Sequence, residues 1–357
     1  MRVLGLAKYG ARAASTRQRM LQYRPHLASK GIDIEIRALL GDDYIERLAQ
    51  GTKQPRSAIL SGYIRRIADL MAARRFDVLW VQYEAFPYLP GAVERALTLL
   101  GVPIVYDIDD AIFHMYDRHR SNLVKRVLGN KLVPLLRGAS ACLCGNEYLR
   151  SYTAQYCPNS IVVPTVVDTD DYRPSNRLSL TAAPVVGWIG SPSTWRYVEP
   201  LLPTLLPLFA RHGVLMRVVG AGPRAQGIAG IDAVDWDEAR EVIDIQSMDI
   251  GIMPLPDEPW ARGKCGYKLI QYMACGLPVV ASPVGVNCDI VSDGCNGFLV
   301  TEADQWVAAL KRLITEPDLR HTFGKDGARV VEARYSLRSQ QDRVAATLKQ
   351  AGSERHR

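Results

Sequence analysis

Two series of short apolar runs, separated by helical patterns, constrain this chain more than any other feature. The first series lies at 3–6, 32–39, 78–81, 104–106, 141–144 and 161–163. The second lies at 185–189, 215–219, 231–234, 250–253, 279–282 and 297–300. Strands that alternate with helices build doubly wound parallel sheets. The sequence therefore predicts two Rossmann-like α/β domains that face each other across a cleft.

A polar, proline-containing segment, TDDYRPSNRLSLTAAP (169–184), separates the two series and has the composition of an interdomain linker. At 357 residues the chain also exceeds the size at which a single core keeps growing. Ligands of such sheets bind at the carboxyl ends of the strands, so we expect the functional cleft between the domains. The predicted parts are a first domain over 1–170, a linker over 171–184, a second domain over 185–335, and a C-terminal helix over 336–357 that crosses back to the first domain.

The basic excess of the chain lies entirely in its first half. Residues 1–170 carry 23 Lys and Arg against 16 Asp and Glu, whereas the remainder is balanced. The segments 56–75 and 116–137 show apolar and cationic faces at helical spacing, which suits an anionic membrane surface or a lipid diphosphate. The alternative is that these arginines simply solvate exposed helix faces. Nucleic acid is a weaker candidate, since no aromatic-rich basic sheet is present.

The remaining composition indicates a cytoplasmic protein. No apolar run approaches the length of a membrane-spanning helix, and the N-terminal segment reads as a first strand rather than a secretory signal. Seven cysteines without regular spacing indicate a reducing compartment rather than a disulfide framework or a zinc site. We therefore expect a cytoplasmic location, with peripheral binding to the cytoplasmic face of the inner membrane.

The most informative local motif is GKCGYKLIQYMACGLPVVASPVGVNCDIVSDGCNGFLV (263–300). It contains a turn with glycine and lysine, a short amphipathic helix, a Gly-Leu-Pro turn and a buried strand. This order directs a helix N-terminus, with lysines beside it, to the edge of a parallel sheet. Backbone N–H groups and lysine together make a site for a diphosphate.

Five segments of the second half resemble the C-terminal domain of the group 1, or family 4, glycosyltransferases, which have the GT-B fold. In chain order they are VVPTVVDTDDYRP, VVGWIGSPSTWR, MRVVGAGP, DIGIMPLPDEPWARGKCGYKLIQYMACGLPVVAS and IVSDGCNGFLV. In the first half, ASTRQRMLQYRPHLASKGIDIEI and GVPIVYDIDDAIF resemble a bacterial subgroup that builds surface polysaccharides. The resemblance implies transfer of a sugar from a nucleotide diphosphate to a lipid-linked or saccharide acceptor, with retention of configuration and without a metal or other cofactor.

The resemblance also implies a donor site in the second domain. The family uses an Arg/Lys pair to stabilise the leaving diphosphate, and we assign Arg196 with Lys264 or Lys268 to that pair. Further donor-binding candidates are Gly190, Ser191, Thr194, Gly220, Gly266, Tyr267 and Gln271.

The chain departs from the family at two positions. The family signature has two glutamates eight positions apart, and Gly263 and Gln271 stand in their places. Gln271 can still hydrogen-bond a ribose hydroxyl, but Gly263 cannot hold a sugar. Either a neighbour such as Glu258 or Lys264 takes over, or donor preference differs, or activity is lost. A non-catalytic, glycosyltransferase-like binding partner is therefore a second hypothesis.

In the first domain the acidic motif 107–110 follows a strand. Family members carry His-Asp where Asp109 and Asp110 stand, so we assign these two carboxylates to orienting acceptor or sugar hydroxyls, with one acting as base. Two other roles stay open, a metal role for an Asp-x-Asp motif and a cap for a helix that begins at Ala111. The acceptor-binding candidates are Gly10, Ser15, Arg17, Glu84, Asp107 and His114.

Two other enzyme classes share parts of this sequence pattern. A nucleotide-sugar 2-epimerase shares the two-domain fold, but its free substrate leaves the basic first domain unexplained. A Rossmann dehydrogenase is disfavoured because no Gly-x-Gly-x-x-Gly follows the first strand.

Overall fold

The computed structural model describes residues 1–49, 52–175 and 184–355. The chain divides into two compact units. Unit 1 comprises Met1–Thr165, Arg262–Cys265 and Gln340–Arg357, and unit 2 comprises Val166–Ala261 and Gly266–Ser339. Of the predicted linker, residues 176–183 lie outside the described residues, and 171–175 belong to unit 2.

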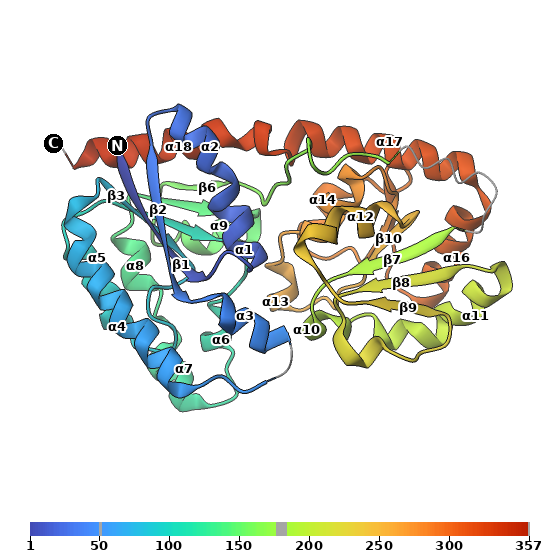
Figure 1. The fold of residues 1–357 in the computed structure, drawn as a ribbon, viewed down its shortest axis with the longest axis horizontal. Helices are drawn as coiled ribbons and strands as arrows, with labels where there is room; N and C mark the ends of the chain where they lie inside the picture. Colours follow the sequence, from blue (N-terminus) through green and yellow to red (C-terminus); the bar gives the residue numbers. More distant parts are fainter. Residues whose placement is uncertain (50–51, 176–183, 356–357) are drawn as a thin grey trace. The chain divides into compact units, whose positions relative to one another are not determined.

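Unit 1 is built on a six-stranded sheet, in which every paired strand is parallel to its neighbour (Figure 1). The strands, in the spatial order β2-β1-β3-β4-β5-β6, are β1 (Arg2–Tyr9), β2 (Asp33–Leu40), β3 (Val78–Gln82), β4 (Ile104–Ile108), β5 (Ala141–Cys144) and β6 (Ser160–Val162). The α-helices are α1 (Ala14–Arg19), α2 (Arg24–Ser29), α3 (Asp42–Ala49), α4 (Arg56–Ala72), α5 (Gly91–Thr98), α6 (His114–Asp117), α7 (Asn122–Leu128), α8 (Val133–Arg137) and α9 (Glu147–Thr153). Strands β3, β4 and β5 are buried along their whole length, which is why they read as continuous apolar runs.

Unit 2 repeats this design. Its parallel strands, in the order β12-β11-β10-β7-β8-β9, are β7 (Val185–Ile189), β8 (Leu215–Val219), β9 (Ile231–Val234), β10 (Ile250–Met253), β11 (Val279–Ala281) and β12 (Gly297–Leu299). The helices that follow β7 in the chain are α10 (Pro192–Trp195), α11 (Leu202–His212), α12 (Glu241–Gln246), α13 (Pro259–Arg262), α14 (Tyr267–Ala274), α15 (Asn287–Ile290), α16 (Ala303–Thr315), α17 (Pro317–Arg334) and α18 (Leu337–Glu354).

The core of unit 2 has two parts, one on each face of its sheet. Neighbouring residues of a strand point to opposite faces, so Val218 packs in the cluster around Trp188 and Trp306, while Val219 packs in the cluster around Tyr272. Both faces are covered by helices, as a parallel sheet requires. The predicted class, two doubly wound parallel sheets, is confirmed.

The strand order shows where a ligand can bind in each unit. In unit 2 the first strand, β7, lies between β8 and β10, and in unit 1 the first strand, β1, lies between β2 and β3. The connections on the two sides of the first strand run toward opposite edges of the sheet. A crevice therefore opens beyond the carboxyl end of that strand. The residues that follow β7 and β1 are therefore the first candidates for a site.

The last helix contributes to unit 1. From Gln340 onward α18 belongs to that unit, and Gly352 lies so close to Met1 that a Cβ at this position would be 2.7 Å from the Met1 sulfur. None of the described helices is both long and apolar enough to cross a bilayer.

Candidate functional site

In unit 2 the backbone at the carboxyl end of β7 leaves room for Lys268. A Cβ at Gly190 would lie 2.7 Å from Lys268 Cε and 2.6 Å from the Trp188 ring. The Lys268 ammonium lies 5.7 Å from the centroid of that ring. Glycine is therefore needed at 190, and the lysine is positioned by packing against a glycine and a tryptophan at the strand end.

Lys268 is the second residue of α14, whose start is fixed by another glycine. Gly266 is the N-cap and has φ +65°, and a Cβ there would lie 2.3 Å from Ile290 Cδ1. Both the conformation and the space thus exclude a side chain. The first N–H groups of a helix have no intrahelical partner, and they carry the positive end of the helix dipole. Together with a lysine ammonium they form a site suited to an anion such as a diphosphate.

The turns after β7 and β8 pack backbone against backbone. Gly220 has φ +80°, and a Cβ there would lie 2.3 Å from the Gly190 carbonyl oxygen. Ser191 and Thr194 form a capping box at the start of α10, in which the Ser191 N–H donates to Thr194 Oγ1 at 3.3 Å. The predicted donor residues Gly190, Ser191, Thr194 and Gly220 thus all lie at the carboxyl ends of β7 and β8.

Arg196 follows α10 and is exposed. Its guanidinium donates to the Tyr197 hydroxyl at 2.9 Å and lies 4.9 Å from the centre of that ring. The Tyr197 hydroxyl in turn donates to Glu258 at 3.4 Å. The hydrogen bond with Tyr197 raises the pKa of Arg196, so this group stays cationic.

Gln271 lies in a buried polar network that sequence reasoning missed. Its amide nitrogen donates to the Tyr172 hydroxyl at 3.2 Å and to Glu241 Oε1 at 2.9 Å. The Trp236 indole N–H donates to the other oxygen of Glu241 at 2.6 Å. Gln271 is 2 % exposed and Glu241 8 % exposed, so both side chains belong to one buried network, and the assignment of Gln271 to the ribose stays a prediction. The side chains of Tyr267 and Tyr172 also share a hydrogen bond.

In unit 1, Asp109 and Asp110 follow β4. Asp109 has an oxygen, Oδ1, that is buried and has no hydrogen-bond partner among the described residues. Burial raises the pKa of Asp109 to about 7, with Arg19 opposing this shift and Asp110 adding to it. The Tyr83 side chain hydrogen-bonds Asp109, and Tyr83 has φ +62°, a conformation that non-glycine residues rarely adopt.

The four residues Arg262–Cys265, grouped with unit 1, are fixed there by four contacts. The Asn146 amide donates to the carbonyl oxygens of Gly263 at 3.1 Å and Lys264 at 2.9 Å. The Cys265 thiol donates to the Asp109 carbonyl oxygen at 3.0 Å. The Lys264 ammonium pairs with Asp110 at 3.0 Å. The sequence offered Lys264 or Lys268 as the lysine of the diphosphate site. The structure groups Lys264 with unit 1 and Lys268 with unit 2, and it gives Lys264 a carboxylate partner.

Two predicted acceptor ligands are structural. Asp107 is fully buried and accepts from Arg19 at 2.8 Å and from the Trp80 indole at 3.1 Å. Glu84 is also fully buried, between the ammonium groups of Lys8 at 3.0 Å and Lys131 at 2.7 Å. Burial alone would raise the pKa of Glu84, but the two lysines hold that pKa below its ordinary value. Buried charges persist only when they are paired, so both assignments are corrected.

The predicted acceptor residues near the N-terminus lie between the end of β1 and the end of α1. Gly10 lies where a Cβ would be 2.2 Å from Asp42 Oδ1. Ser15 does not cap α1, because that helix begins one residue earlier, with Ala13 as an N-cap that makes no side-chain bond. Arg17 donates to the Arg12 carbonyl oxygen at 2.7 Å.

His114, on α6, lies between two side chains. Its Nδ1 is 2.9 Å from Asp117 Oδ1 and its Nε2 is 2.8 Å from the Tyr148 hydroxyl. An imidazole placed between a carboxylate and a hydroxyl has its orientation and tautomer fixed by them. The structure therefore ties His114 of α6 to Tyr148 of α9.

A comparison with known proteins matches part of the second half of the chain. Residues 183–316 match the model of the family described as glycosyl transferases group 1. This region is therefore similar to the group 1 glycosyltransferases. D-inositol 3-phosphate glycosyltransferase of Saccharomonospora viridis is 25 % identical over 237 residues, which cover 58 % of this chain and 53 % of the relative. The chain thus spans about half the length of that relative.

Solved structures extend the likeness in fold to the whole chain. Sucrose-phosphate synthase from Thermosynechococcus elongatus aligns over 99 % of this chain and 100 % of its own, with a TM-score of 0.71 and 15 % identity. Anabaena Alr3699/HepE in complex with UDP-glucose aligns over 98 % and 100 %, with a TM-score of 0.70 and 18 % identity. At these identities the likeness shows the fold, and the predicted GT-B fold is confirmed.

The structure leaves no room for a side chain at position 263, where the family that the sequence resembles has a glutamate. A Cβ at Gly263 would lie 2.4 Å from the Ala111 Cβ and 3.0 Å from the Ala111 nitrogen. The close approach lets Asn146 reach the Gly263 carbonyl oxygen. A glutamate at this position would displace the segment from unit 1, so the departure follows from packing.

We expect Gly263→Ala to destabilise unit 1 by about 1–3 kcal/mol, the usual cost of overpacking. Gly263→Glu, which restores the family residue, should cost more and should not raise activity. Thermal unfolding followed by circular dichroism measures the effect. Gly41→Ala is the matched control, because nothing lies within 4 Å of a Cβ at that position. Equal melting temperatures for Gly263→Ala and the control would contradict the packing described here.

Proposed function

We propose that the protein transfers a sugar from a nucleotide diphosphate to a hydroxyl of a lipid-linked or saccharide acceptor, with retention of configuration, in the synthesis of a surface polysaccharide or glycoconjugate. The bond from the anomeric carbon to the diphosphate oxygen breaks, and the electron pair leaves with the diphosphate. The acceptor oxygen bonds to that carbon and its proton passes to a base.

The observation that carries this proposal is the position of Lys268. It lies at the start of α14, against Gly190 at the end of the central strand of the region that is similar to the group 1 glycosyltransferases. Binding a nucleotide sugar at ~10 µM requires about −7 kcal/mol, whereas a helix N-terminus supplies only ~0.3–2 kcal/mol toward an anion. Charge-assisted hydrogen bonds of about 1.5–3 kcal/mol each supply much of the rest. Lys268 and Arg196 are the cations of unit 2 that we assign to this role.

Two carboxylates complete the proposed chemistry. Glu241, oriented by Gln271 and Trp236, accepts a hydrogen bond from a ribose hydroxyl in place of the missing second glutamate. Asp109 takes the acceptor proton, because a group with a pKa of about 7 matches a general base that works near neutrality. Asp110, whose charge is balanced by Lys264, orients the acceptor or sugar hydroxyls.

A UDP-hexose is the first donor to test, since one structural relative was solved with UDP-glucose. We expect UDP-sugars, or another nucleotide diphosphate sugar of the GDP, ADP or TDP series, to raise the melting temperature. A ligand at 100 times its Kd stabilises by about 2.7 kcal/mol. UMP is the control, because it lacks the second phosphate that the Lys268 site is proposed to bind. If none of these diphosphates stabilises the protein, the donor site is wrong.

A non-catalytic binding partner is the second candidate. The absence of space for a glutamate at 263 favours it, because that residue lies near the transferred sugar in the family. The two candidates differ in turnover. Stabilisation by a donor, with neither donor hydrolysis nor transfer to any saccharide or lipid-linked acceptor, would favour the non-catalytic role. Release of nucleotide only when an acceptor is added would favour the transferase over an epimerase.

A further inference from the structure

Unit 2 contains a cavity of about 600 Å³ that the proposed function does not use. Four of its lining residues stand directly before strands, since Met248 and Asp249 precede β10 and Leu277 and Pro278 precede β11. Parallel strands all begin at the same edge of a sheet, so the cavity lies at the amino ends of these strands. The proposed donor site lies at the carboxyl ends. The cavity is therefore a separate feature at the opposite edge of the same sheet.

Helix α14 extends from the donor site to the cavity. Its first turn carries Lys268, and its last residue, Ala274, lines the cavity. A helix of 8 residues is about 12 Å long. Tyr172 also lines the cavity, and its hydroxyl accepts a hydrogen bond from Gln271 of the same helix. A small molecule in the cavity would thus contact α14 at the end away from Lys268.

One wall of the cavity is a face of α17, which runs along the side of unit 2 (Figure 1). Gly324 fixes this helix against the turn after α14, because a Cβ there would lie 1.9 Å from the Gly276 carbonyl oxygen. The cavity has the size of small-molecule sites, which measure roughly 300–1,000 Å³. Five of its lining residues recur every three or four positions on one face of the helix, and they are Pro317, His321, Lys325, Ala328 and Glu332.

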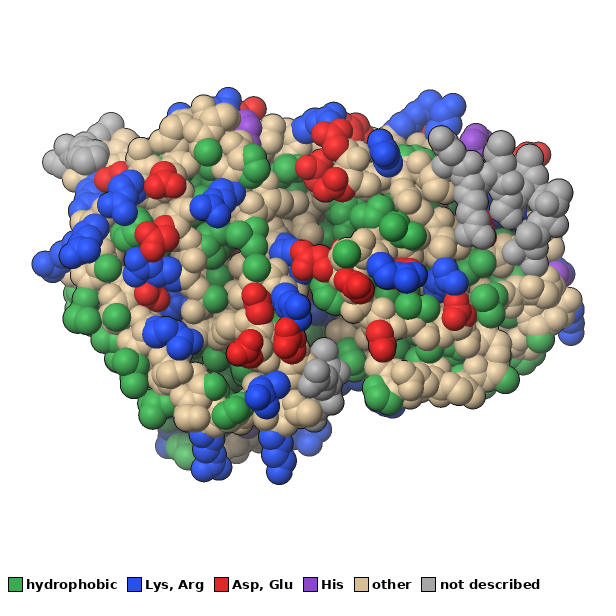
Figure 2. Space-filling model, in the orientation of Figure 1, with side chains coloured by type: hydrophobic (Ala, Val, Ile, Leu, Met, Phe, Trp, Pro, Cys, Tyr) green, Lys and Arg blue, Asp and Glu red, His purple; other side chains and the backbone are tan. Residues whose placement is uncertain are grey.

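Cations outnumber acids among the lining side chains. The cations are Arg173, Arg320, Lys325 and Arg329, and the acids are Asp249 and Glu332. Both carboxylates have other partners, because Asp249 accepts from a backbone N–H at 2.7 Å and Glu332 lies 3.8 Å from the Arg338 guanidinium. Arg329 also pairs with Asp326 at 3.0 Å. An excess of positive charge therefore remains on the lining. Figure 2 shows basic side chains on the side of unit 2 where α17 runs in Figure 1.

Arg320 is fixed at the cavity by the end of α16. Its guanidinium donates to the carbonyl oxygens of Leu313 at 2.7 Å and Ile314 at 3.0 Å. Arg320 is half-buried, and burial lowers its pKa, with Asp249 opposing this shift. A cation that has lost part of its hydration is stabilised by an anion placed beside it. A guanidinium that is fixed by the protein and lines an open cavity is therefore suited to bind an anionic group.

We propose that this cavity binds a small phosphate monoester with an apolar body. Arginine presents paired N–H donors that match the oxygens of a phosphate. A phosphate monoester carries about 1.5 to 2 negative charges near neutral pH, which the positive lining balances. Met248, Leu277 and Ala328 give the apolar body a surface to contact. The inference goes beyond the proposed function and does not depend on it, because binding here involves neither donor nor transfer.

The test is isothermal titration calorimetry of the full chain with phenyl phosphate, without nucleotide or acceptor. Phenyl phosphate should bind, benzoate should bind more weakly because it carries one charge, and phenol should give no heat of binding. Lys268→Met should bind phenyl phosphate as the original chain does, because Lys268 lies at the other edge of the sheet. A failure here leaves the proposed function standing, and a failure of the donor assay leaves this inference standing.

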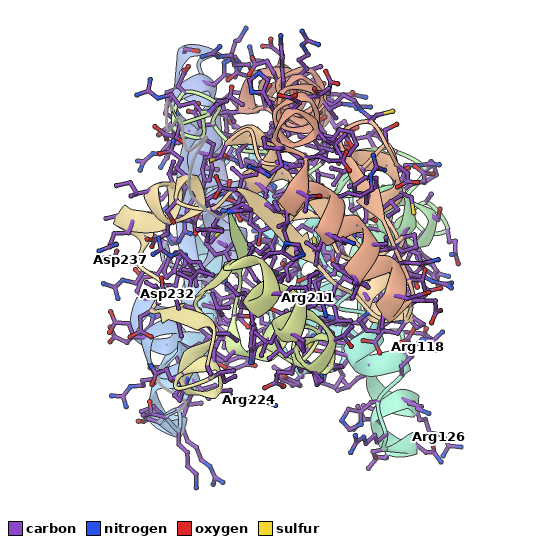
Figure 3. The ribbon with its side chains drawn as sticks, turned by 90° about the vertical axis from the view of Figure 1, so that its right-hand side faces the viewer. Arg118, Arg126, Arg211, Arg224, Asp232 and Asp237 are labelled. Carbon is purple, nitrogen blue, oxygen red and sulfur yellow. The ribbon has the colours of Figure 1, made fainter. Side chains whose placement is uncertain are left out.

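The variant Arg173→Gln, Lys325→Gln and Arg329→Gln should bind phenyl phosphate about tenfold more weakly or worse, since charge-assisted hydrogen bonds are lost. The three side chains are exposed, and circular dichroism with the melting temperature checks that the fold is kept. Arg211→Gln is the matched control. Arg211 is an exposed arginine at the end of α11 (Figure 3), outside the lining of the cavity, and its variant should bind as the original chain does.

A second variant, Ala328→Trp, tests the space rather than the charge. The indole should fill part of the cavity and weaken the binding of phenyl phosphate about tenfold or more without any change in net charge. Three results overturn the inference. They are no binding at millimolar phenyl phosphate, unchanged affinity in either cavity variant, and loss of binding in Lys268→Met, which would assign the phosphate to the start of α14.

Discussion

Replacing Lys268 with methionine is expected to lower kcat/KM for sugar transfer by about 10²–10³-fold, the loss seen when one preorganised electrostatic group of a transition state is removed. Methionine keeps the length and apolar body of the lysine, so the packing against Trp188 and Gly190 persists while the ammonium is lost. Negative charge grows on the leaving diphosphate in the transition state. The loss should therefore appear in kcat as well as in donor KM.

Initial rates with the donor that most stabilises the protein measure this effect. Lys311→Met is the matched control, because Lys311 is an exposed residue of α16 in the same unit, and it should act as the original chain does. A Lys268→Met enzyme with unchanged kcat and a raised KM would show that the ammonium binds the donor but does not assist departure of the diphosphate. Unchanged values of both parameters would remove Lys268 from the site.

The strands could be predicted from the sequence because parallel strands covered on both faces are continuous apolar runs. The run 104–106 lies within β4 and the run 141–144 coincides with β5. Helix starts were less certain. Ser15 has the side chain of a cap, yet α1 begins at Ala14 without one. The hydroxyl that bonds backbone near this helix start belongs instead to Thr16, which donates to the Tyr9 carbonyl oxygen.

The site was harder to predict because the partner of each charge is distant in sequence. Asp107, Asp109 and Asp110 read alike as carboxylates that follow a strand. Asp107 meets Arg19, which is 88 positions away, and becomes structural. Glu84 likewise meets Lys131 across 47 positions. No local sequence pattern shows which carboxylate at a strand end pairs with a buried cation and which one is available to a substrate.

The surroundings of the segment Arg262–Cys265 also could not be predicted from local sequence. Its lysine and glycine lie just before a helix start, and local pattern alone puts Lys264 beside Lys268. The grouping with unit 1 depends on Asn146, which is 118 positions from Lys264. The glycine and the lysine at the start of α14 could be predicted together because they are neighbours in sequence, whereas Glu241 was missed because it is brought to Gln271 from another helix.

Replacing Asp109 with asparagine should lower transfer by about 10²–10⁴-fold, the usual contribution of a general base. A base must be deprotonated to accept a proton, so kcat/KM of the original enzyme should rise with pH to a plateau above about pH 7, where the Asp109 pKa lies. The Asp109→Asn enzyme should lack that rise. A pH–rate profile from 5 to 9 measures both. Asp43→Asn, on the exposed first turn of α3, is the control.

The Asp109→Asn substitution should raise the stability of the protein at high pH, although it lowers the activity. The pKa of Asp109 is raised in the folded state to about 7 from its ordinary 3.8, so the folded chain holds its proton at pH values where the unfolded chain has released it. The charge at Asp109 therefore costs stability progressively as pH rises from about 4 to 7, and the whole cost is present above pH 7. Asparagine never ionises. The Asp109→Asn protein should melt higher than the original chain at pH 8, with the difference shrinking toward zero near pH 4. A lower melting temperature for this variant at pH 8 would mean that the carboxylate is stabilised by its neighbours, and its assignment as a base with a raised pKa would be lost.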